Sequence, residues 1–278
     1  MARLLVIGNV NADEVVRLDA PPVPGAHLSG RPEGIRLGGG GANAAVALAQ
    51  AGHDVAIRAA VGDDEAGAHL VEACRNHGLD VSGLHVLPGR ATNRPLILID
   101  PTGERTLIAR KTIAADALGP PPGDIAADGV LVKTFNPALA AFMADRTARG
   151  PVVAHAPPTA FDHWPATVWV TSESEVTAAG GSDPWGAARA RAGPMLQGLV
   201  VTRGAAGAEA LGPDGARLAV PAHPVDRVVD TTGAGDVFAA GLLHGLLEGA
   251  DIGAAMSLAA LWAARAIETD GSVPAIGS

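Results

Sequence analysis

The residues of this chain best suited to chemistry are a carboxylate and two glycines just before a predicted helix. The segment Asp230-Thr231-Thr232-Gly233-Ala234-Gly235-Asp236 runs directly into a helical pattern that extends to Glu248. Glycine lets the backbone turn tightly and leaves amide N–H groups uncovered, and the helix dipole adds positive potential there. We therefore predict an anion site that can receive a phosphoryl group, with Asp236 as a base beside it. The alternative is a glycine-containing loop in which Asp236 only caps the helix.

A second glycine cluster, Gly38-Gly39-Gly40-Gly41-Ala42-Asn43, opens another predicted helix and places Asn43 in its first turn. The backbone there can approach a ligand closely. Written as Gly39-x-Gly41-x-x-Ala44, the cluster imitates a dinucleotide-binding fingerprint, but that motif normally follows the first strand, which is predicted at residues 4–7. A dinucleotide site is therefore the weaker alternative. The sequence contains no Gly-x-x-x-x-Gly-Lys-Ser/Thr phosphate loop.

Composition limits the class of protein and of partner. Hydrophobic residues make up 48% of the 278 residues and charged residues 18%, which is typical of a globular chain. The net charge of −9 argues against a nucleic acid or an anionic membrane surface as partner, so we expect a small ligand. Cys74 is the single cysteine, predicted to be buried on a helix, and it excludes an internal disulfide. With no apolar run long enough for a signal peptide or a membrane span, we predict a cytoplasmic protein.

The elements that must position these residues alternate between strand and helix. Strands are predicted at 4–7, 55–60, 130–132, 152–154 and 199–202, a hairpin at 208–211 and 217–220, and helices at 42–51, 64–77, 137–149, 234–248 and 251–268. This alternation predicts an α/β fold with a doubly wound, mostly parallel sheet flanked by helices.

Two segments interrupt the alternation and predict a small accessory sheet. Residues 13–18 alternate weakly, and strands at 95–99 and 106–109 flank the turn signal Asp100-Pro101-Thr102-Gly103-Glu104. Because a βαβ region separates the two pieces, the accessory sheet must be a discontinuous insertion, suited to act as a lid over a site. The predicted division assigns residues 12–37 and 91–112 to the lid, and residues 1–11, 38–90 and 113–278 to an α/β nucleotide-binding core.

Together, the two glycine clusters resemble the paired signatures of the ribokinase-like, or PfkB, family of carbohydrate kinases. The first signature runs from Gly39 through Asn43 to Gly52 and Gly62, and the second covers residues 230–243. The segment 9–13 also resembles the start of ribokinases, and the resemblance spans essentially the whole chain. It implies a ribokinase-like fold and an ATP-dependent phosphotransferase that acts on a hydroxyl of a sugar or sugar-like substrate.

The resemblance also implies roles for particular residues. Asp236 would take the proton from the substrate hydroxyl as that oxygen attacks the γ-phosphorus of ATP. The turn from Gly233 to Asp236 would form the anion hole, through the amides of Ala234, Gly235 and Asp236. The residues implied in substrate binding are Asn11, Asp13, Gly39, Gly40 and Asn43. Those implied in nucleotide binding are Thr202, Arg203, Gly204, Gly207 and Ser172. Alternatively, Asn11 and Asp13 cap a turn, and the loop 202–207 is a plain surface turn.

Two cations are implied by the same resemblance. Ser172-x-x-Glu175 matches the family's Asn-x-x-Glu motif, in which the acid acts on the Mg²⁺ of ATP through water; this chain keeps the acid and loses the amide. The residues that resemble the family's potassium site are Asp230, Thr232, Ala266, Thr269 and Gly271. Ordinary helix termination at Gly271 explains the last three equally well.

Two departures from the ribokinase pattern bear on the substrate. Ribokinases carry a lysine where this chain has Gly40, and a sugar-binding glutamate where it has Phe135. Phe135 offers a stacking surface for the substrate, and Lys133 offers a charge for an acidic or phosphorylated one, although a structural role for Lys133 is the simpler interpretation. The alternatives to a sugar kinase are a nucleoside kinase of the same fold and a non-catalytic ligand-binding descendant. The resemblance also implies a homodimer joined through the lid.

Overall fold

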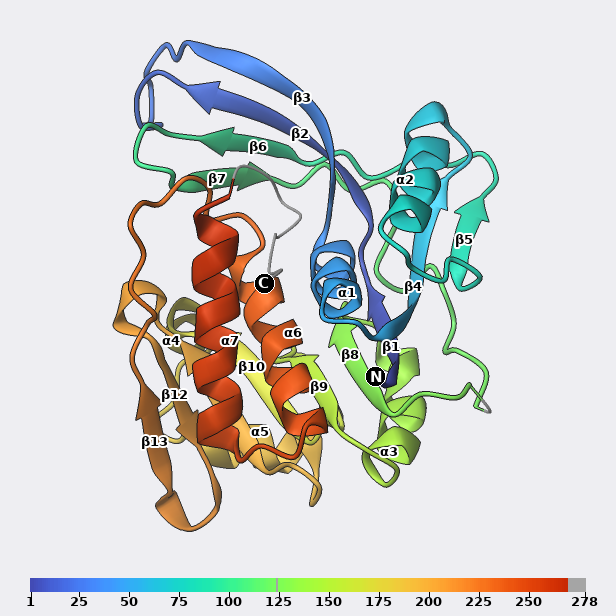
Figure 1. Ribbon diagram of the computed structural model, residues 1–278, viewed down its shortest axis with the longest axis vertical. Coiled ribbons are helices and arrows are strands. Elements are labelled where there is room, and N and C mark those ends of the chain that lie inside the picture. Colours follow the sequence, from blue (N-terminus) through green and yellow to red (C-terminus); the bar gives the residue numbers. More distant parts are fainter. Residues whose placement is uncertain (124, 270–278) are drawn as a thin grey trace.

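The computed structural model describes residues 1–123 and 125–269, and Figure 1 shows helices packed on a large sheet with a smaller sheet beyond the ends of its strands. The strands of the large sheet are β1 (Arg3–Gly8), β4 (Asp54–Gly62), β5 (Leu84–Leu87), β8 (Gly129–Lys133), β9 (Val152–His155), β10 (Val168–Ser172), β11 (Gly198–Thr202), β12 (Ala208–Leu211) and β13 (Arg217–Val220). The helices are α1 (Gly40–Gln50), α2 (Glu65–Asn76), α3 (Ala140–Thr147), α4 (Glu173–Ala179), α5 (Pro184–Ala192), α6 (Ala234–Leu247) and α7 (Ile252–Ile267).

The large sheet has nine strands in the order β13-β12-β11-β10-β9-β8-β1-β4-β5. The strands from β11 to β5 in this order run parallel, and β12 and β13 continue the sheet as an antiparallel hairpin. The predicted doubly wound, mostly parallel sheet is therefore confirmed.

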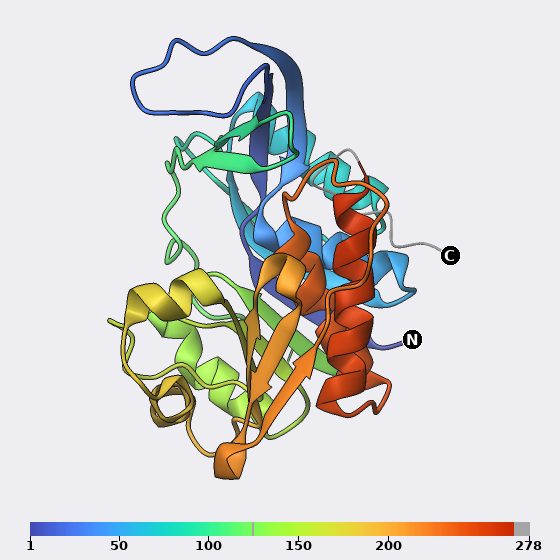
Figure 2. The same ribbon diagram turned by 90° about the vertical axis from the view of Figure 1, so that its left-hand side faces the viewer.

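Both faces of the central strands of this sheet are buried, which explains why these strands are apolar along their length. In β1, Leu4 and Val6 pack in a cluster with α1, α6 and α7, while Leu5 and Ile7 pack in a second cluster with α3 and α5. A strand covered on both faces needs apolar side chains at every position. Figure 2 shows the two helical layers on opposite sides of the sheet.

Cys74 lies fully buried on α2, as predicted, and burial raises the pKa of its thiol to about 11. Such a thiol stays protonated and inert at neutral pH. Among the described residues, no helix combines the length and the apolar character needed to cross a membrane.

The small sheet has four strands in the order β3-β2-β6-β7. They are β2 (Asn11–Leu18), β3 (Gly30–Gly38), β6 (Leu96–Ile99) and β7 (Arg105–Ile108). Because they come from two stretches that are separated in sequence by α1, β4, α2 and β5, the predicted discontinuous β-sheet lid is confirmed. Figures 1 and 2 show the lid beyond one end of the large sheet. The division of the chain into domains at particular residues stays a prediction.

The lid is bonded to the core at the tip of its β6–β7 hairpin. The carbonyl oxygen of Gly103 accepts hydrogen bonds from the backbone N–H of Thr231 at 3.3 Å and from the Thr231 hydroxyl at 3.4 Å. Arg36 on β3 reaches the same segment, with its Nη1 3.6 Å from Oδ2 of Asp230. The lid therefore contacts the loop that leads directly into α6.

Candidate active site

The candidate site lies where the strand order of the large sheet reverses. From β1, the sheet continues to β4 and β5 on one side and to β8 through β11 on the other. The carboxyl ends of β1 and β8 are adjacent, with Gly8 in register with Lys133. In open α/β sheets, ligands bind in the crevice that forms at such a switch point, outside the carboxyl ends of the strands.

Asp236, in the first turn of α6, is held at this crevice by two other elements. Its Oδ1 lies 2.9 Å from Nζ of Lys133 at the end of β8, and its Oδ2 accepts a hydrogen bond of 3.0 Å from the Asn43 amide on α1. The side chains of Asp236 and Lys133 are 19% and 10% exposed. Burial alone would raise the pKa of Asp236, but the Lys133 ammonium and the Asn43 amide outweigh it and hold the pKa below the usual value. Asp236 is therefore ionised at neutral pH and can accept a proton.

The turn before Asp236 leaves part of its backbone available. Gly233 opens α6 in a left-handed conformation, with φ of 79°, and no side chain caps the helix. The N–H of Ala234 donates to the Thr231 carbonyl at 3.4 Å, and the N–H of Asp236 donates to the Gly233 carbonyl at 2.9 Å. The amides of Gly233 and Gly235 make no hydrogen bond with any described residue. Of the amides predicted for the anion hole, Gly235 is thus open, while Ala234 and Asp236 donate within the turn.

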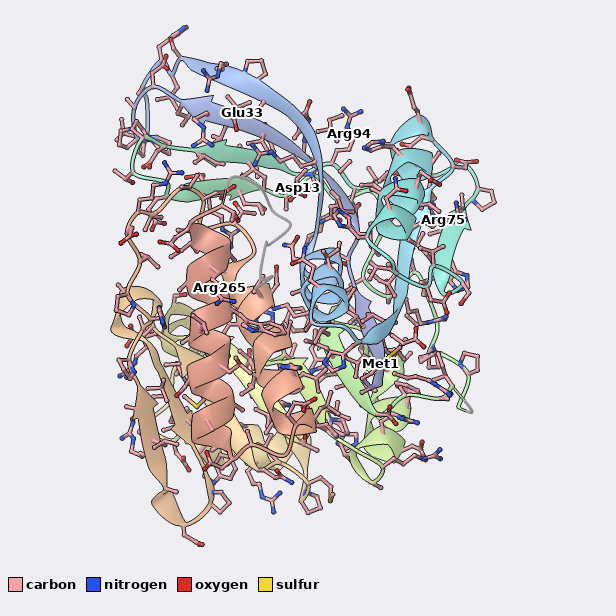
Figure 3. The ribbon with its side chains drawn as sticks, in the orientation of Figure 1. Met1, Asp13, Glu33, Arg75, Arg94 and Arg265 are labelled. Carbon is pink, nitrogen blue, oxygen red and sulfur yellow. The ribbon has the colours of Figure 1, made fainter. Side chains whose placement is uncertain are left out.

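A cleft of about 890 Å³, partly open to solvent, lies between this turn and the lid; we call it the acceptor cleft. The residues predicted to bind substrate that line it are Asn11, Asp13, Gly39, Gly40 and Asn43. Oδ1 of Asn11, Oδ1 of Asn43 and Oγ1 of Thr232 are buried without a hydrogen-bond partner in the described chain. Buried polar atoms are normally paired, so these groups indicate a ligand with hydrogen-bonding groups of its own. Figure 3 labels Asp13 where the lid strands meet the core.

Gly40, which has no side chain, leaves the space that the Lys133 side chain occupies beside Asp236. A Cβ atom on Gly40 would lie 2.9 Å from Oδ1 of Asp236 and 3.2 Å from Cε of Lys133. A side chain at this position would therefore push the pair apart. The adjacent Gly39 has φ of 92°, which L side chains rarely adopt, and a Cβ there would lie 2.5 Å from the Asn9 carbonyl.

The residues predicted to bind nucleotide lie further along the same edge of the sheet. Ser172 ends β10 and is in register with Thr202, which ends β11. The loop after β11 turns tightly, since the N–H of Arg203 donates to the Gly207 carbonyl at 2.7 Å and the N–H of Gly207 donates to the Gly204 carbonyl at 3.0 Å. The structure therefore brings all five predicted residues to the ends of these two strands, away from the described lining of the acceptor cleft.

Glu175, predicted to act on Mg²⁺, forms a capping box with Ser172 at the start of α4. Its carboxylate accepts hydrogen bonds of 2.8 Å from the Ser172 amide and from Nε2 of His155. Burial opposes the charge, but His155 and Ser172 outweigh it and lower the pKa of Glu175 to about 2. Among the described residues, no group of three or more His, Cys, Asp or Glu side chains is placed to hold a metal ion. The role of Glu175 toward Mg²⁺ stays a prediction.

Of the residues predicted to bind potassium, the structure describes Asp230, Thr232, Ala266 and Thr269, and Gly271 lies outside the described residues. The N–H of Asp230 donates to the Ile267 carbonyl at 3.3 Å, which brings the loop before α6 against the end of α7. The Ala266 carbonyl accepts a hydrogen bond of 2.8 Å from the Thr269 hydroxyl. A potassium site at this junction stays a prediction.

Phe135 lies outside the acceptor cleft, and its predicted role in binding substrate stays a prediction. Its ring packs against those of His155, Phe161 and Trp164, with centroids 5.3, 6.1 and 6.3 Å away, and Phe135 is not among the described residues that line the acceptor cleft. The physical reason is that β8 ends at Lys133 and the chain bends at Thr134. Phe135 is thereby turned toward the aromatic group instead of the cleft.

A structural role was the simpler prediction for Lys133, and the structure instead places its ammonium beside Asp236. Its partner Asp236 is distant in sequence, so no local pattern marks the pair. One signal was available: of the 20 lysine and arginine residues, only Lys111 and Lys133 are lysine.

The large sheet, the lid and an ionised carboxylate beside a glycine turn define a class, the phosphotransferases that act on small hydroxyl acceptors. The chain belongs to the pfkB family of carbohydrate kinases, which it matches over residues 1–276. It is an ATP-dependent carbohydrate kinase.

Individual relatives agree with this assignment. The ATP-dependent ribose-1-phosphate kinase of Halopiger xanaduensis is 30% identical over 272 residues, which cover 93% of this chain and 90% of that protein. The structure of ribokinase from Cryptococcus neoformans in complex with ADP is similar with a TM-score of 0.79 and 25% identity, covering 99% of this chain and 98% of that chain. The ribokinase of Schizosaccharomyces pombe matches at 31% identity over 39% of this chain and 36% of that protein.

Proposed function

We propose that this kinase transfers the γ-phosphoryl group of ATP to a hydroxyl of a sugar or sugar-like acceptor, with Asp236 as the general base. The observation that carries the proposal is the position of Asp236. It is ionised, and it lies in the lining of the acceptor cleft at the turn whose Gly235 amide is open. A hydroxyl bound in the cleft would thus meet the base and the phosphoryl group at one point.

In the proposed reaction, the acceptor oxygen forms a bond to the γ-phosphorus as the bond from that phosphorus to the β–γ bridging oxygen breaks. ADP leaves, and the hydroxyl proton passes to the Asp236 carboxylate. The amides of Gly233 and Gly235, at the positive end of α6, stabilise charge on the phosphoryl oxygens. A base placed in this way contributes roughly 10²–10⁴-fold to the rate.

Lys133 contributes to the proposed phosphoryl transfer through its positive charge. In the free enzyme its ammonium keeps Asp236 ionised, as their distance of 2.9 Å supports. When Asp236 accepts the proton, that ion pair weakens, and the ammonium is left beside the phosphoryl group that is being transferred. A compact, nearly buried positive charge at this point favours the transition state.

The nucleotide would extend from the turn toward the ends of β10 and β11, where the predicted nucleotide-binding residues lie. Mg²⁺ bound to ATP would neutralise phosphate charge, and K⁺ held by the loop before α6 and the end of α7 would order the turn. The unpaired hydroxyl of Thr232 offers one oxygen ligand there. The homodimer through the lid and the cytoplasmic location are retained as predictions.

A nucleoside acceptor is the second candidate, and its structural cue is weaker. The aromatic platform expected for a base was Phe135, which packs against other aromatic rings away from the acceptor cleft. The amide and carboxylate groups that do line the cleft suit the hydroxyls of a sugar.

The test is phosphoryl transfer from ATP to a panel of sugars and nucleosides, with the wild type and Asp236→Asn. We expect turnover of at least one sugar by the wild type, and loss of turnover with retained ATP binding in the variant. Asp214→Asn, in the exposed turn between β12 and β13, is the matched control. Undiminished turnover in Asp236→Asn would reject the base, and nucleosides as the best acceptors would favour the second candidate.

A further inference from the structure

Two cations that line the acceptor cleft have no part in the proposed transfer. Arg105 begins β7 of the lid, and Lys111 follows the end of that strand. Neither side chain makes a hydrogen bond or an ion pair with any residue of the described chain. A third cation, Arg110, differs from them, because it is paired with Glu14 and donates from Nε to the Arg94 carbonyl at 2.7 Å.

The carboxylates in the cleft do not account for these two charges. Of the two acids that line it, Asp236 is already paired with Lys133, and Asp13 is 3% exposed beside Gly38 of the glycine cluster. The other residues near the lid strands that line the cleft are apolar, namely Pro95, Leu107 and Ala109, apart from Arg110. The charge of Arg105 acts on Asp236 and helps to lower its pKa. Counted with Lys133, however, Arg105 and Lys111 give this site three cations against the two acids, and such an excess of positive charge favours an anionic group on the ligand.

Lysine usage in the chain points to the same cleft. The sequence has only two lysines, and arginine supplies the other positive side chains. Lys133 pairs with Asp236, and Lys111 lines the cleft that contains Asp236. Where arginine is used almost everywhere else, two lysines at one site indicate a need for compact ammonium groups there.

The position of these cations indicates that they would contact the acceptor and not the nucleotide. The described residues that line the cleft come from the ends of β1 and β2, the start of α1, the lid and the turn before α6. Neither Ser172 nor the loop 202–207 is among them. Arg105 and Lys111 thus line the cleft that contains Asp236 and not the strand ends where the nucleotide is predicted to bind.

We infer that the acceptor is an anionic sugar, whose phosphate or carboxylate lies against Arg105 and Lys111. Its hydroxyls lie against Asn11, Asp13 and Asn43 on the opposite side of the cleft. One hydroxyl is then presented to Asp236. The inference rests on the proposed function and narrows its acceptor to a class, the sugar phosphates and sugar acids.

Four probes that share a pentose framework test the charge of the acceptor. They are ribose, ribose 1-phosphate, ribose 5-phosphate and ribonate, each assayed for ATP-dependent phosphorylation by the wild-type enzyme. We expect kcat/KM for at least one charged probe to exceed that for ribose by about tenfold or more, as a charge-assisted hydrogen bond supplies. Comparison of the two sugar phosphates with the sugar acid shows whether the site prefers a phosphate or a carboxylate. Ribose or a nucleoside phosphorylated as efficiently as every charged probe would overturn the inference.

Variants of the two cations test where the anion lies. Arg105→Gln and Lys111→Gln are each expected to raise KM for the preferred charged probe about tenfold. The KM for ATP should change less than about twofold, and ribose should be affected as little. Arg75→Gln, the same loss of charge at an exposed position of α2 labelled in Figure 3, is the matched control. An equal rise in KM for ATP would indicate that the two cations bind the nucleotide and would overturn the inference.

A binding measurement keeps this test independent of turnover. Titration calorimetry of the charged probes is carried out without nucleotide on the wild type and the Arg105→Gln/Lys111→Gln double variant. We expect the double variant to bind the preferred probe at least about tenfold more weakly, and to bind ribose unchanged. Equal affinity of the two proteins would overturn the anion site, even if the kinase activity is demonstrated. Absence of phosphorylation of any acceptor, with this difference in affinity present, would instead remove the proposed function.

Discussion

Glu175 and Asp236 occupy equivalent positions in two helices, but their surroundings differ. Each lies in the first turn of its helix, α4 for Glu175 and α6 for Asp236. The first helix begins with Ser172 in a capping box, and the second begins with Gly233 in a left-handed conformation without a side-chain cap. The residue before the helix thus decides whether the acid in the first turn is bonded to a cap or is available to a ligand.

A side chain that caps a helix accepts hydrogen bonds from the free backbone amides of the first turn, whereas a glycine at the same position leaves these amides without a side-chain partner. Glu175 is bonded to Ser172, His155 and Thr171, all within the protein. Asp236 has Lys133 and Asn43 as partners, and the Gly235 amide next to it is open. The first turn of a helix needs partners for its amides, and a ligand supplies them where no side chain does. The comparison identifies α6 as the helix start suited to bind an anion.

Removing each carboxylate in turn is the strongest test of this comparison. Asp236→Asn is expected to lower kcat by about 10²–10⁴-fold, because the proton then has no acceptor. Glu175→Gln should lower kcat by less than about tenfold, since its carboxylate is engaged in a helix cap. Steady-state kinetics of both variants measure the difference. Equal losses would show that both acids serve the reaction and that the comparison is wrong.

Lys133→Met tests the charge that keeps Asp236 ionised. We expect kcat to fall by about 10²-fold, as when one transition-state donor is removed. Without the ammonium, burial raises the pKa of Asp236, so the acid limb of the kcat profile should move to higher pH than in the wild type. Lys133→Arg, which keeps the charge, is the control and should keep the wild-type acid limb. An unchanged pH profile in Lys133→Met would contradict the role given to the pair.

Ser172→Ala tests the capped helix through stability. Loss of an N-cap side chain costs about 1 kcal/mol, which corresponds to roughly 2–4 °C in Tm for a chain of this size. Thermal unfolding followed by circular dichroism measures the shift, and kcat should change little. A large loss of kcat with an unchanged Tm would mean that Ser172 serves the nucleotide and not the helix.

The pH dependence of stability gives the smallest expected effect. Because its hydrogen bonds lower the pKa of Glu175 from 4.5 to about 2, the folded protein binds the proton less tightly than the unfolded chain. The stability that Glu175 contributes is therefore present above pH 4.5 and is lost as the pH falls toward 2. Urea unfolding of the wild type and Glu175→Gln at a series of pH values should show the two curves converging below pH 4.5. A constant difference at every pH would contradict the low pKa.

The sequence predicted elements well where local signals mark both ends. The hairpin strands at 208–211 and 217–220 agree with β12 and β13, because the turn between them contains Pro213, Asp214 and Gly215. Strand β3 was not predicted as an element. Its sequence contains three glycines and a proline, Gly34 has φ of 94°, and its pairing with β2 shifts register between Val15 and Val16. Only the neighbouring strand holds such a sequence in an extended form.

The same limit applies to the site. Asp236, Asn43 and Asn11, which line one cleft, were predicted together because they stand in or beside glycine motifs that are continuous in sequence. The contact between Lys133 and Asp236 was missed because it joins β8 to α6, and it forms only when both pack near Gly40. The packing of Phe135 away from the acceptor cleft was not evident from the sequence for a similar reason, because the bend at Thr134 depends on how the chain leaves the sheet. Motifs thus identify the site residues, and tertiary packing decides their partners.

The hydrogen bonds between Gly103 and Thr231 join the tip of the β6–β7 hairpin to the turn that we propose to bind phosphate. Thr231 is two residues before Gly233, and its carbonyl also holds the amide of Ala234. Any outward swing of the lid has to release Thr231 and loosen the turn with it. In the proposed reaction, entry of the acceptor would therefore be linked to the geometry of this turn, which would help to protect ATP from attack by water while the cleft stands open.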